Sequence, residues 1–182
     1  MLALARPTPA HFGIFVVDIE KMTRFYTDLF GLTITDRGRG RTFKSDLVFM
    51  SASPDQHHQF VLASGRPPDA VFSTVMQSSF LVPSIQALRD IRRKALDLGA
   101  TNMRNLNHGN ALSIYFSDLE GNTVEVYMDT PYYVPQPHGD PLDLNLSDEE
   151  IMRETERICR SDPGFMPLEE WQKRFQGARQ TL

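Results

Sequence analysis

Short apolar runs typical of strands alternate along this chain with longer stretches that have helical spacing. Segment 11–18 is such a run. An amphipathic helix follows and is ended by Gly31, with apolar residues at Ile19, Met22, Phe25, Tyr26 and Leu29. Further apolar runs at 32–35, 47–50 and 59–62 predict three strands. The first part of the chain therefore predicts the order β-α-β-β-β.

The same pattern then begins again. A strand at 79–82 and a helix ended by Gly99 precede strands at 101–104, 111–116 and 123–128. A constant offset pairs Ile19 with Ile85 and Phe25 with Ile91, and the turn positions agree as well. This indicates an internal duplication. It predicts an α+β fold of two paired βαβββ modules (8–65 and 72–130) that form a curved sheet or half-barrel.

The segment after residue 130 has a different character. It opens with prolines that predict no regular structure over about ten residues: Pro131, Pro135, Pro137 and Pro141. Ser147 followed by Glu150 is a capping-box pattern that predicts a helix to about residue 160. A last helix from 167 places Trp171 and Phe175 on one apolar face. We expect residues 131–182 to be a Pro-rich segment and helical tail packed on a domain of residues 8–130.

Composition is that of an ordinary globular protein. The 182 residues, 41% hydrophobic and 23% charged, suffice for a real core. A net charge of -4 gives no basic face, so nucleic acid is not expected as a partner. No apolar run approaches the roughly 18 residues of a membrane helix, so no membrane association is expected. The N-terminus does not read as a signal peptide, and one cysteine, Cys159, fits a reducing compartment. We expect a cytoplasmic protein and leave a homo-oligomer open.

The stretch 107–125 concentrates the candidate chemistry. Two β-branched and aromatic runs flank turn residues 118–122, so a hairpin is expected. Glu125 stands between two valines and therefore faces the opposite side of the sheet. That side is either solvent or a cavity. The duplication supplies candidate partners, because His11 and Gln77 open the first strands of the two halves.

This stretch resembles the vicinal-oxygen-chelate superfamily of glyoxalases, bleomycin-resistance proteins and extradiol dioxygenases. It is most similar to single-domain type I extradiol dioxygenases of the catechol or 2,3-dihydroxybiphenyl type. Their signature is matched here by His108, Ile114, Tyr115, Asp118, Gly121 and Glu125. The chain departs from it at Leu119, where the family has proline. The resemblance implies paired βαβββ modules around a metal cleft, over about residues 8–130.

The resemblance also implies roles for individual residues. His11 and Glu125 would be metal ligands, and Gln77 stands where the dioxygenases have a second histidine ligand. His58 and His108 would be catalytic acid/base or oxygen-handling residues, and Tyr115 would bind a substrate oxygen. Fe(II) is the metal expected, with Mn(II) or another divalent metal as an alternative. The implied enzyme cleaves a small catechol-like aromatic ring with O2, as in aromatic compound catabolism.

Two other functions of the same fold stay open. The first is a non-enzymatic protein of the bleomycin-resistance type, which binds small aromatic molecules or drugs. Gln77 favours it, since an amide oxygen is a neutral metal ligand and a weaker one than histidine. A glyoxalase-type lyase or isomerase comes third. That group uses an acidic ligand on the last strand of the first module, and residues 56–64 contain no acid.

Overall fold

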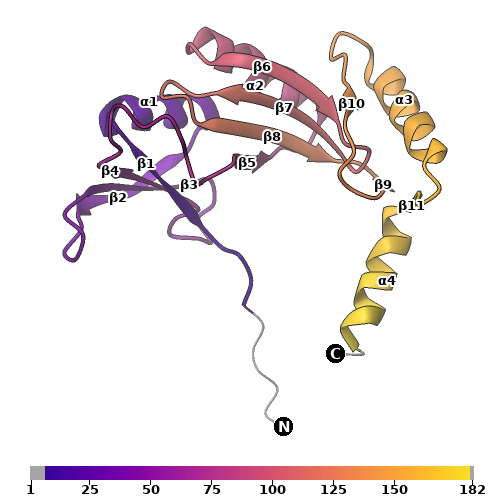
Figure 1. The fold of residues 1–182 in the computed structure, drawn as a ribbon, viewed down its shortest axis with the longest axis horizontal. Coiled ribbons are helices and arrows are strands. Elements are labelled where there is room, and N and C mark those ends of the chain that lie inside the picture. The colour runs from indigo at the N-terminus through magenta and orange to yellow at the C-terminus, as the bar shows by residue number, and fades with distance from the viewer. Residues whose placement is uncertain (1–6, 181–182) are drawn as a thin grey trace. The chain divides into compact units, whose positions relative to one another are not determined.

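A computed structural model describes residues 7–180 of the chain, and the side chains of residues 7–177. Its internal contacts divide the chain into two units, one up to Val75 and one from Met76 onward. We describe each unit by itself. Figure 1 shows the order of the elements.

The first unit is a four-stranded sheet with one helix. Its elements are β1 (Phe12–Val16), α1 (Ile19–Phe30), β2 (Thr33–Arg39), β3 (Asp46–Ser51) and β4 (Phe60–Ser64). The strand order is β1-β4-β3-β2, with β1 parallel to β4 and the other pairs antiparallel. Asp18 caps α1 by accepting a hydrogen bond from the Lys21 amide, and Gly31 ends it in the left-handed conformation at φ 67°. The apolar stripe of α1 is buried with the sheet and forms the core of this unit.

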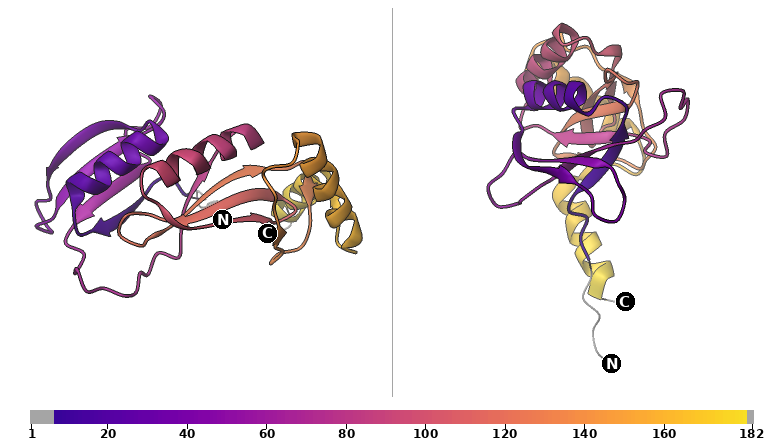
Figure 2. Two further views of the ribbon diagram at one scale, coloured as in Figure 1. Left: turned by 90° about the horizontal axis from the view of Figure 1, so that it is seen from above. Right: turned by 90° about the vertical axis from the view of Figure 1, so that its left-hand side faces the viewer.

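The second unit repeats this arrangement. It contains β5 (Ser78–Leu81), α2 (Ile85–Asp97), β6 (Thr101–Asn107), β7 (Ala111–Ser117) and β8 (Thr123–Asp129). The order β5-β8-β7-β6 matches that of the first sheet. Strand β5 is parallel to β8, as β1 is to β4. Helix α2 covers one face of the sheet, as Figure 2 shows. Leu112, Ile114 and Val126 are fully buried. The predicted α+β class with two βαβββ modules is confirmed.

The tail belongs to the second unit. It contains β9 (Tyr132–Tyr133), β10 (Asp140–Pro141), α3 (Asp148–Ser161), β11 (Met166–Pro167) and α4 (Leu168–Gln180). The prediction of no regular structure among the prolines was wrong at two places, because β9 pairs with β11 and β10 pairs with the edge of β6. Proline is compatible with such an edge position, where its missing N–H faces away from the ladder. The Ser147–Glu150 capping box opens α3 as expected.

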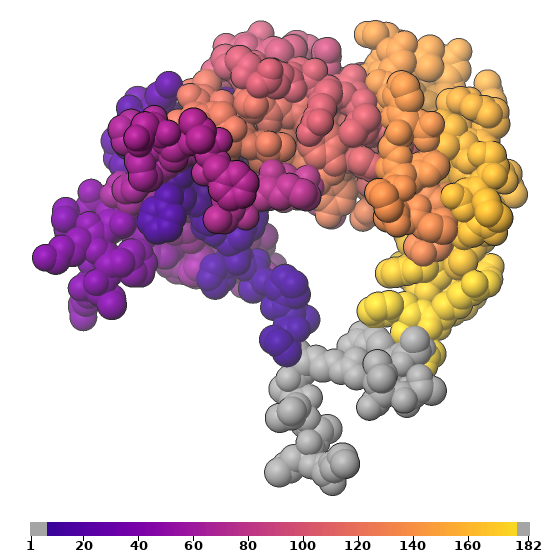
Figure 3. Space-filling view, in the orientation of Figure 1, coloured from indigo at the N-terminus to yellow at the C-terminus, as the bar shows by residue number. Residues whose placement is uncertain are grey.

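Polar contacts attach the tail to the rest of the second unit, and Figure 3 shows the orange atoms of the tail directly beside it. Asn107 Nδ2 at the end of β6 donates a buried hydrogen bond of 2.8 Å to Thr155 Oγ1 on α3. Arg89 on α2 donates to the carbonyl oxygens of Leu144 and Leu146, at 2.8 and 2.7 Å. On α4, Trp171 and Phe175 share one face, with ring centroids 5.4 Å apart. The predicted domain boundary at residue 130 stays a prediction.

No helix within residues 7–180 is long and apolar enough to cross a membrane.

Candidate functional site

Glu125 lies on the face of the second sheet that α2 does not cover. Its neighbours Val124 and Val126 are fully buried on the α2 side, and strand alternation turns Glu125 to the other side. The strand register places Tyr115 of β7 and Ser79 of β5 directly beside it, and Arg104 of β6 beside Tyr115. One polar row of Arg104, Tyr115, Glu125 and Ser79 therefore crosses the open face of the sheet.

Four neutral groups donate hydrogen bonds to the carboxylate of Glu125, which is 9% exposed. Gln77 Nε2 and Ser79 Oγ donate to Oε2 at 2.6 and 2.7 Å. Tyr115 Oη and Ser113 Oγ donate to Oε1 at 2.5 and 3.0 Å. Hydrogen bonds to an ionised acceptor are among the stronger ones, and together they fix the orientation of the carboxylate.

Tyr115 joins Glu125 to His108. Its hydroxyl oxygen is 2.9 Å from His108 Nε2, and His108 Nδ1 donates to the backbone oxygen of His138 at 2.6 Å. Because a carbonyl oxygen only accepts, Nδ1 carries a hydrogen and Nε2 is the nitrogen turned toward the phenol. Burial raises the pKa of Tyr115, and the hydrogen bond to Glu125 raises it further, so this side chain stays a phenol at neutral pH.

The tail holds the backbone around His108. Gln136 Nε2 donates to the backbone oxygen of His108 at 2.9 Å and to Asn110 Oδ1 at 3.0 Å. The turn itself needs Gly109, whose φ is 75°. The Pro-rich segment, predicted only to pack on the domain, therefore also positions a candidate catalytic histidine.

The first unit gathers three histidines and an aspartate. His57 Nε2 is 2.8 Å from Asp36 Oδ2, and His57 Nδ1 is 3.0 Å from His58 Nδ1. The rings of His58 and His11 are in edge contact, with centroids 4.3 Å apart. Burial lowers the pKa of His58, and the neighbouring His11 and His57 lower it further.

This chain of contacts sets the tautomer of His58. Asp36 accepts the Nε2 hydrogen of His57, so in a neutral pair His57 Nδ1 must accept the Nδ1 hydrogen of His58. His58 Nε2 then carries no hydrogen, and its free lone pair can accept a proton. Asp36 and His57 thus form an orienting pair that our sequence analysis did not single out.

The predicted site residues therefore fall into two groups. Gln77, His108, Tyr115 and Glu125 are linked by hydrogen bonds in the second unit. His11 and His58 are in contact in the first unit. The sequence analysis missed Ser79 and Ser113. The only sequence signal is alternation, since Ser113 is two residues from Tyr115 on β7 and Ser79 is two residues from Gln77.

The ligand types present suit a divalent metal in part. A carboxylate oxygen, an amide oxygen and an imidazole all bind such ions. The amide of Gln77 turns its nitrogen toward Glu125 in the structure, so it could ligate only after turning over to present its oxygen. Within residues 7–180, no three His, Cys, Asp or Glu side chains are gathered as a metal site. The set His11, Gln77 and Glu125 stays a prediction.

Comparisons with known proteins agree with this fold. The model of the Glyoxalase/Bleomycin resistance protein/Dioxygenase superfamily matches residues 8–126. Biphenyl-2,3-diol 1,2-dioxygenase 3 of Rhodococcus globerulus is 25% identical over 128 residues, which cover 68% of this chain and 64% of that protein. The chain thus matches less than two thirds of the length of this relative.

Solved structures share the architecture. A glyoxylase/bleomycin resistance protein/dioxygenase domain from Frankia sp. EAN1pec has a TM-score of 0.57 at 21% identity, over 69% of this chain and 100% of that one. The fosfomycin resistance protein FosX of Listeria monocytogenes, in complex with Mn(II) and sulfate, has a TM-score of 0.51 at 19% identity, over 71% and 94%. At these identities the likeness shows the fold. Taken with the family match, it establishes that the chain belongs to the glyoxalase/bleomycin resistance protein/dioxygenase superfamily.

Proposed function

We propose that this protein is a metal-dependent enzyme of the extradiol-dioxygenase kind, which cleaves a catechol-type ring with O2. The observation that carries the proposal is the chain Glu125–Tyr115–His108 on the open face of the second sheet. It puts a carboxylate, a phenol donor and an imidazole within hydrogen-bond reach of one another. The 25% identity to a biphenyl-2,3-diol dioxygenase supports the same class.

We assign the metal to His11, Gln77 and Glu125, with Fe(II) as the preferred ion. When bound, the ion would supply a positive charge that lowers the pKa of both ring hydroxyls, and open positions for oxygen.

The chain's own residues bind the ring and handle its protons. His58 presents the free Nε2 that can take a proton from a ring hydroxyl, and its lowered pKa keeps it neutral and ready to do so at pH 7. Tyr115 remains protonated, and its single hydroxyl hydrogen, which Glu125 accepts in this structure, would have to turn to a substrate oxygen to donate a hydrogen bond there. His108, oriented by the His138 carbonyl, is the second group able to exchange a proton through Nε2.

A non-enzymatic binding protein is the second candidate. It is favoured by the hydrogen bond from Gln77 to Glu125, because four neutral donors satisfy this carboxylate without an ion. The glyoxalase-type alternative has less support. The register of β1 with β4 corresponds to that of β5 with β8, and it puts Val61 where the second unit has Glu125.

Oxygen uptake separates the first two candidates. Protein loaded anaerobically with Fe(II) and then given catechol in air is expected to consume oxygen and form a yellow ring-opened product. The Glu125→Gln variant keeps the size of the side chain and should lose this activity. Gln77→His restores the imidazole of the dioxygenases and should raise it. Binding of catechol with no oxygen uptake, in both the wild type and Gln77→His, would favour the binding protein.

A further inference from the structure

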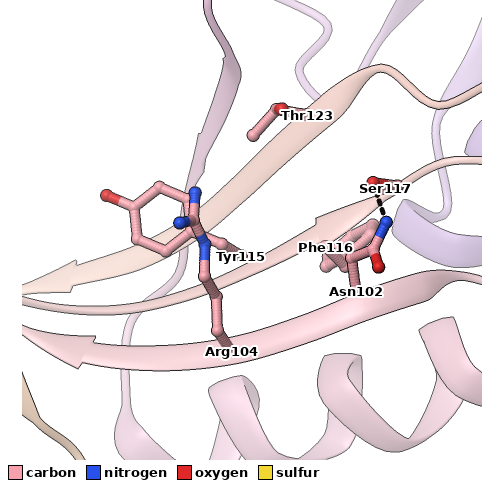
Figure 4. A pocket seen from close by; sticks show the side chains of 6 residues that line it. All are labelled: Asn102, Arg104, Tyr115, Phe116, Ser117 and Thr123. Carbon is pink, nitrogen blue, oxygen red and sulfur yellow. Dashed lines mark hydrogen bonds between the residues drawn. The ribbon is translucent and has the colours of Figure 1, made fainter.

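A small cavity lies on the open face of the second sheet, beside the polar row. Its volume is about 150 Å³. The lining comes from three neighbouring strands, β6, β7 and β8 (Figure 4): Asn102, Arg104, Tyr115, Phe116, Ser117 and Thr123. A dry cavity of about this size can hold a benzene-sized group, so this one has room for a small substituent or part of a ring.

Arg104 is the only charged residue of this lining, and no carboxylate within residues 7–180 forms an ion pair with it. Its guanidinium carbon lies 4.9 Å from the centroid of the Tyr115 ring. Figure 4 shows the two side chains next to each other. Stacking of this kind orients the guanidinium without using its N–H donors. The cavity therefore contains an oriented guanidinium, that of Arg104, whose N–H groups can donate hydrogen bonds to a ligand.

Polar groups complete the lining. Asn102 Nδ2 donates to Ser117 Oγ at 3.1 Å, and the hydroxyl of Thr123 stands on the next strand. Hydroxyl groups can donate to an anionic oxygen, and the planar fork of an arginine matches a carboxylate with two parallel N–H donors. No acidic side chain lines the cavity. The lining thus suits a group with one negative charge.

Tyr115 connects this cavity to the proposed reaction site. One face of its ring lies against Arg104, and its hydroxyl contacts Glu125. Arg104 and Glu125 are on strands β6 and β8, which are separated by β7. With strands about 4.8 Å apart, their backbones are roughly 10 Å from each other. An aromatic ring with an acidic substituent on the side away from its hydroxyls spans such a distance.

We propose that this cavity binds the carboxylate of an aromatic acid, so that the ligand of this protein is a carboxylated catechol and not a neutral one. This inference rests on the proposed function for the place of the hydroxylated ring. Arg104 acts as the specificity-determining residue: it pairs with the carboxylate, while the ring lies along Tyr115 toward Glu125.

Calorimetric titration of the protein under nitrogen, with no metal added, tests the cavity apart from the reaction. The probes are catechol and 3,4-dihydroxybenzoate, which share the ring hydroxyls and differ in the carboxylate. The wild type is expected to bind the acid at least about tenfold more tightly, as a charge-assisted hydrogen bond provides. Raising the salt concentration should reduce this preference.

Arg104→Gln should lose the preference and bind both probes within about threefold of each other. Arg93→Gln is the matched control. It removes the same charge from an exposed position on α2, where Arg93 forms an ion pair with Asp90, and it should keep the preference. Circular dichroism verifies that both variants fold. Equal binding of the two probes by the wild type, no binding of either, or an unchanged preference in Arg104→Gln would overturn the proposal. Oxygen uptake is measured separately, so failure of the enzyme hypothesis gives a different result.

Discussion

Replacing Gly109 with alanine should destabilise the second unit more than the same change at any other left-handed turn of its sheet. Gly109 has φ 75°, and a Cβ there would lie 2.5 Å from Val134 Cγ2 and 3.1 Å from Cys159 Sγ. Both neighbours are fully buried, so neither can move into solvent. The left-handed backbone costs an alanine about 1–2 kcal/mol, and overpacking adds about 1–3 kcal/mol. We expect the free energy of unfolding to fall by about 2–5 kcal/mol.

Gly121 is the matched control, because it has nearly the same conformation and none of the crowding. Its φ is 81°, and a Cβ there would meet nothing within 4 Å. Gly121→Ala should therefore cost only the backbone term, about 1–2 kcal/mol. Urea unfolding followed by circular dichroism measures both variants against the wild type. If Gly109→Ala cost no more than Gly121→Ala, the close packing of the tail against the His108 turn would be refuted.

The remaining predictions concern the tail and its attachment. Thr155→Val removes the hydroxyl that accepts from Asn107 and leaves a buried amide unpaired, so stability should fall by about 1–3 kcal/mol in urea unfolding, whereas Thr155→Ser should lose less. Arg89→Met should lower the free energy of unfolding by about 1–3 kcal/mol, because it breaks charged hydrogen bonds to the segment before α3. Arg93→Met, the control, should change it by about 0.5 kcal/mol or less. Equal effects of the two substitutions would contradict this role of Arg89. Burial raises the pKa of the Cys159 thiol to about 11, so labelling by a disulfide reagent at pH 8 should be more than about 100-fold slower in the native protein than in urea. Since the pKa of Cys159 is higher in the folded state, its contribution to stability should be fully present below about pH 9 and disappear as the pH rises through about 11. The Cys159→Ala variant should not show this loss.

Local patterns predicted much of the fold. The helical spacing from Ile19 to Leu29 and the glycine at 31 gave α1 to within a residue of its observed ends. The internal repeat predicted the element order β-α-β-β-β in both units, and the structure adds that the two sheets share one strand order. The short strand β10 was not predicted. It contains Pro141, and a proline can join a sheet only at an exposed edge strand, here β6, which exists only in the folded chain.

The site was predicted less completely. Glu125, Tyr115 and His108 stand in a recognisable spacing, and the structure links them by hydrogen bonds. Ser79 and Ser113 could not be chosen from sequence, because serines are common on strands and only the cross-strand register sets them beside Glu125. The direction of the Gln77 amide depends on which neighbouring groups donate to Glu125, and no local sequence pattern predicts this.

The most direct test of the proposed function is the metal content of the freshly purified protein. Mass spectrometry of the wild type, and of Glu125→Ala and His11→Ala, should find about one divalent ion per chain in the first and far less in the two variants. The Ser113→Ala variant leaves all three proposed ligands in place and should retain the metal. A wild type that takes up no divalent ion even when Fe(II) or Mn(II) is supplied, or variants that hold it as tightly as the wild type, would contradict a metal centre formed by His11, Gln77 and Glu125.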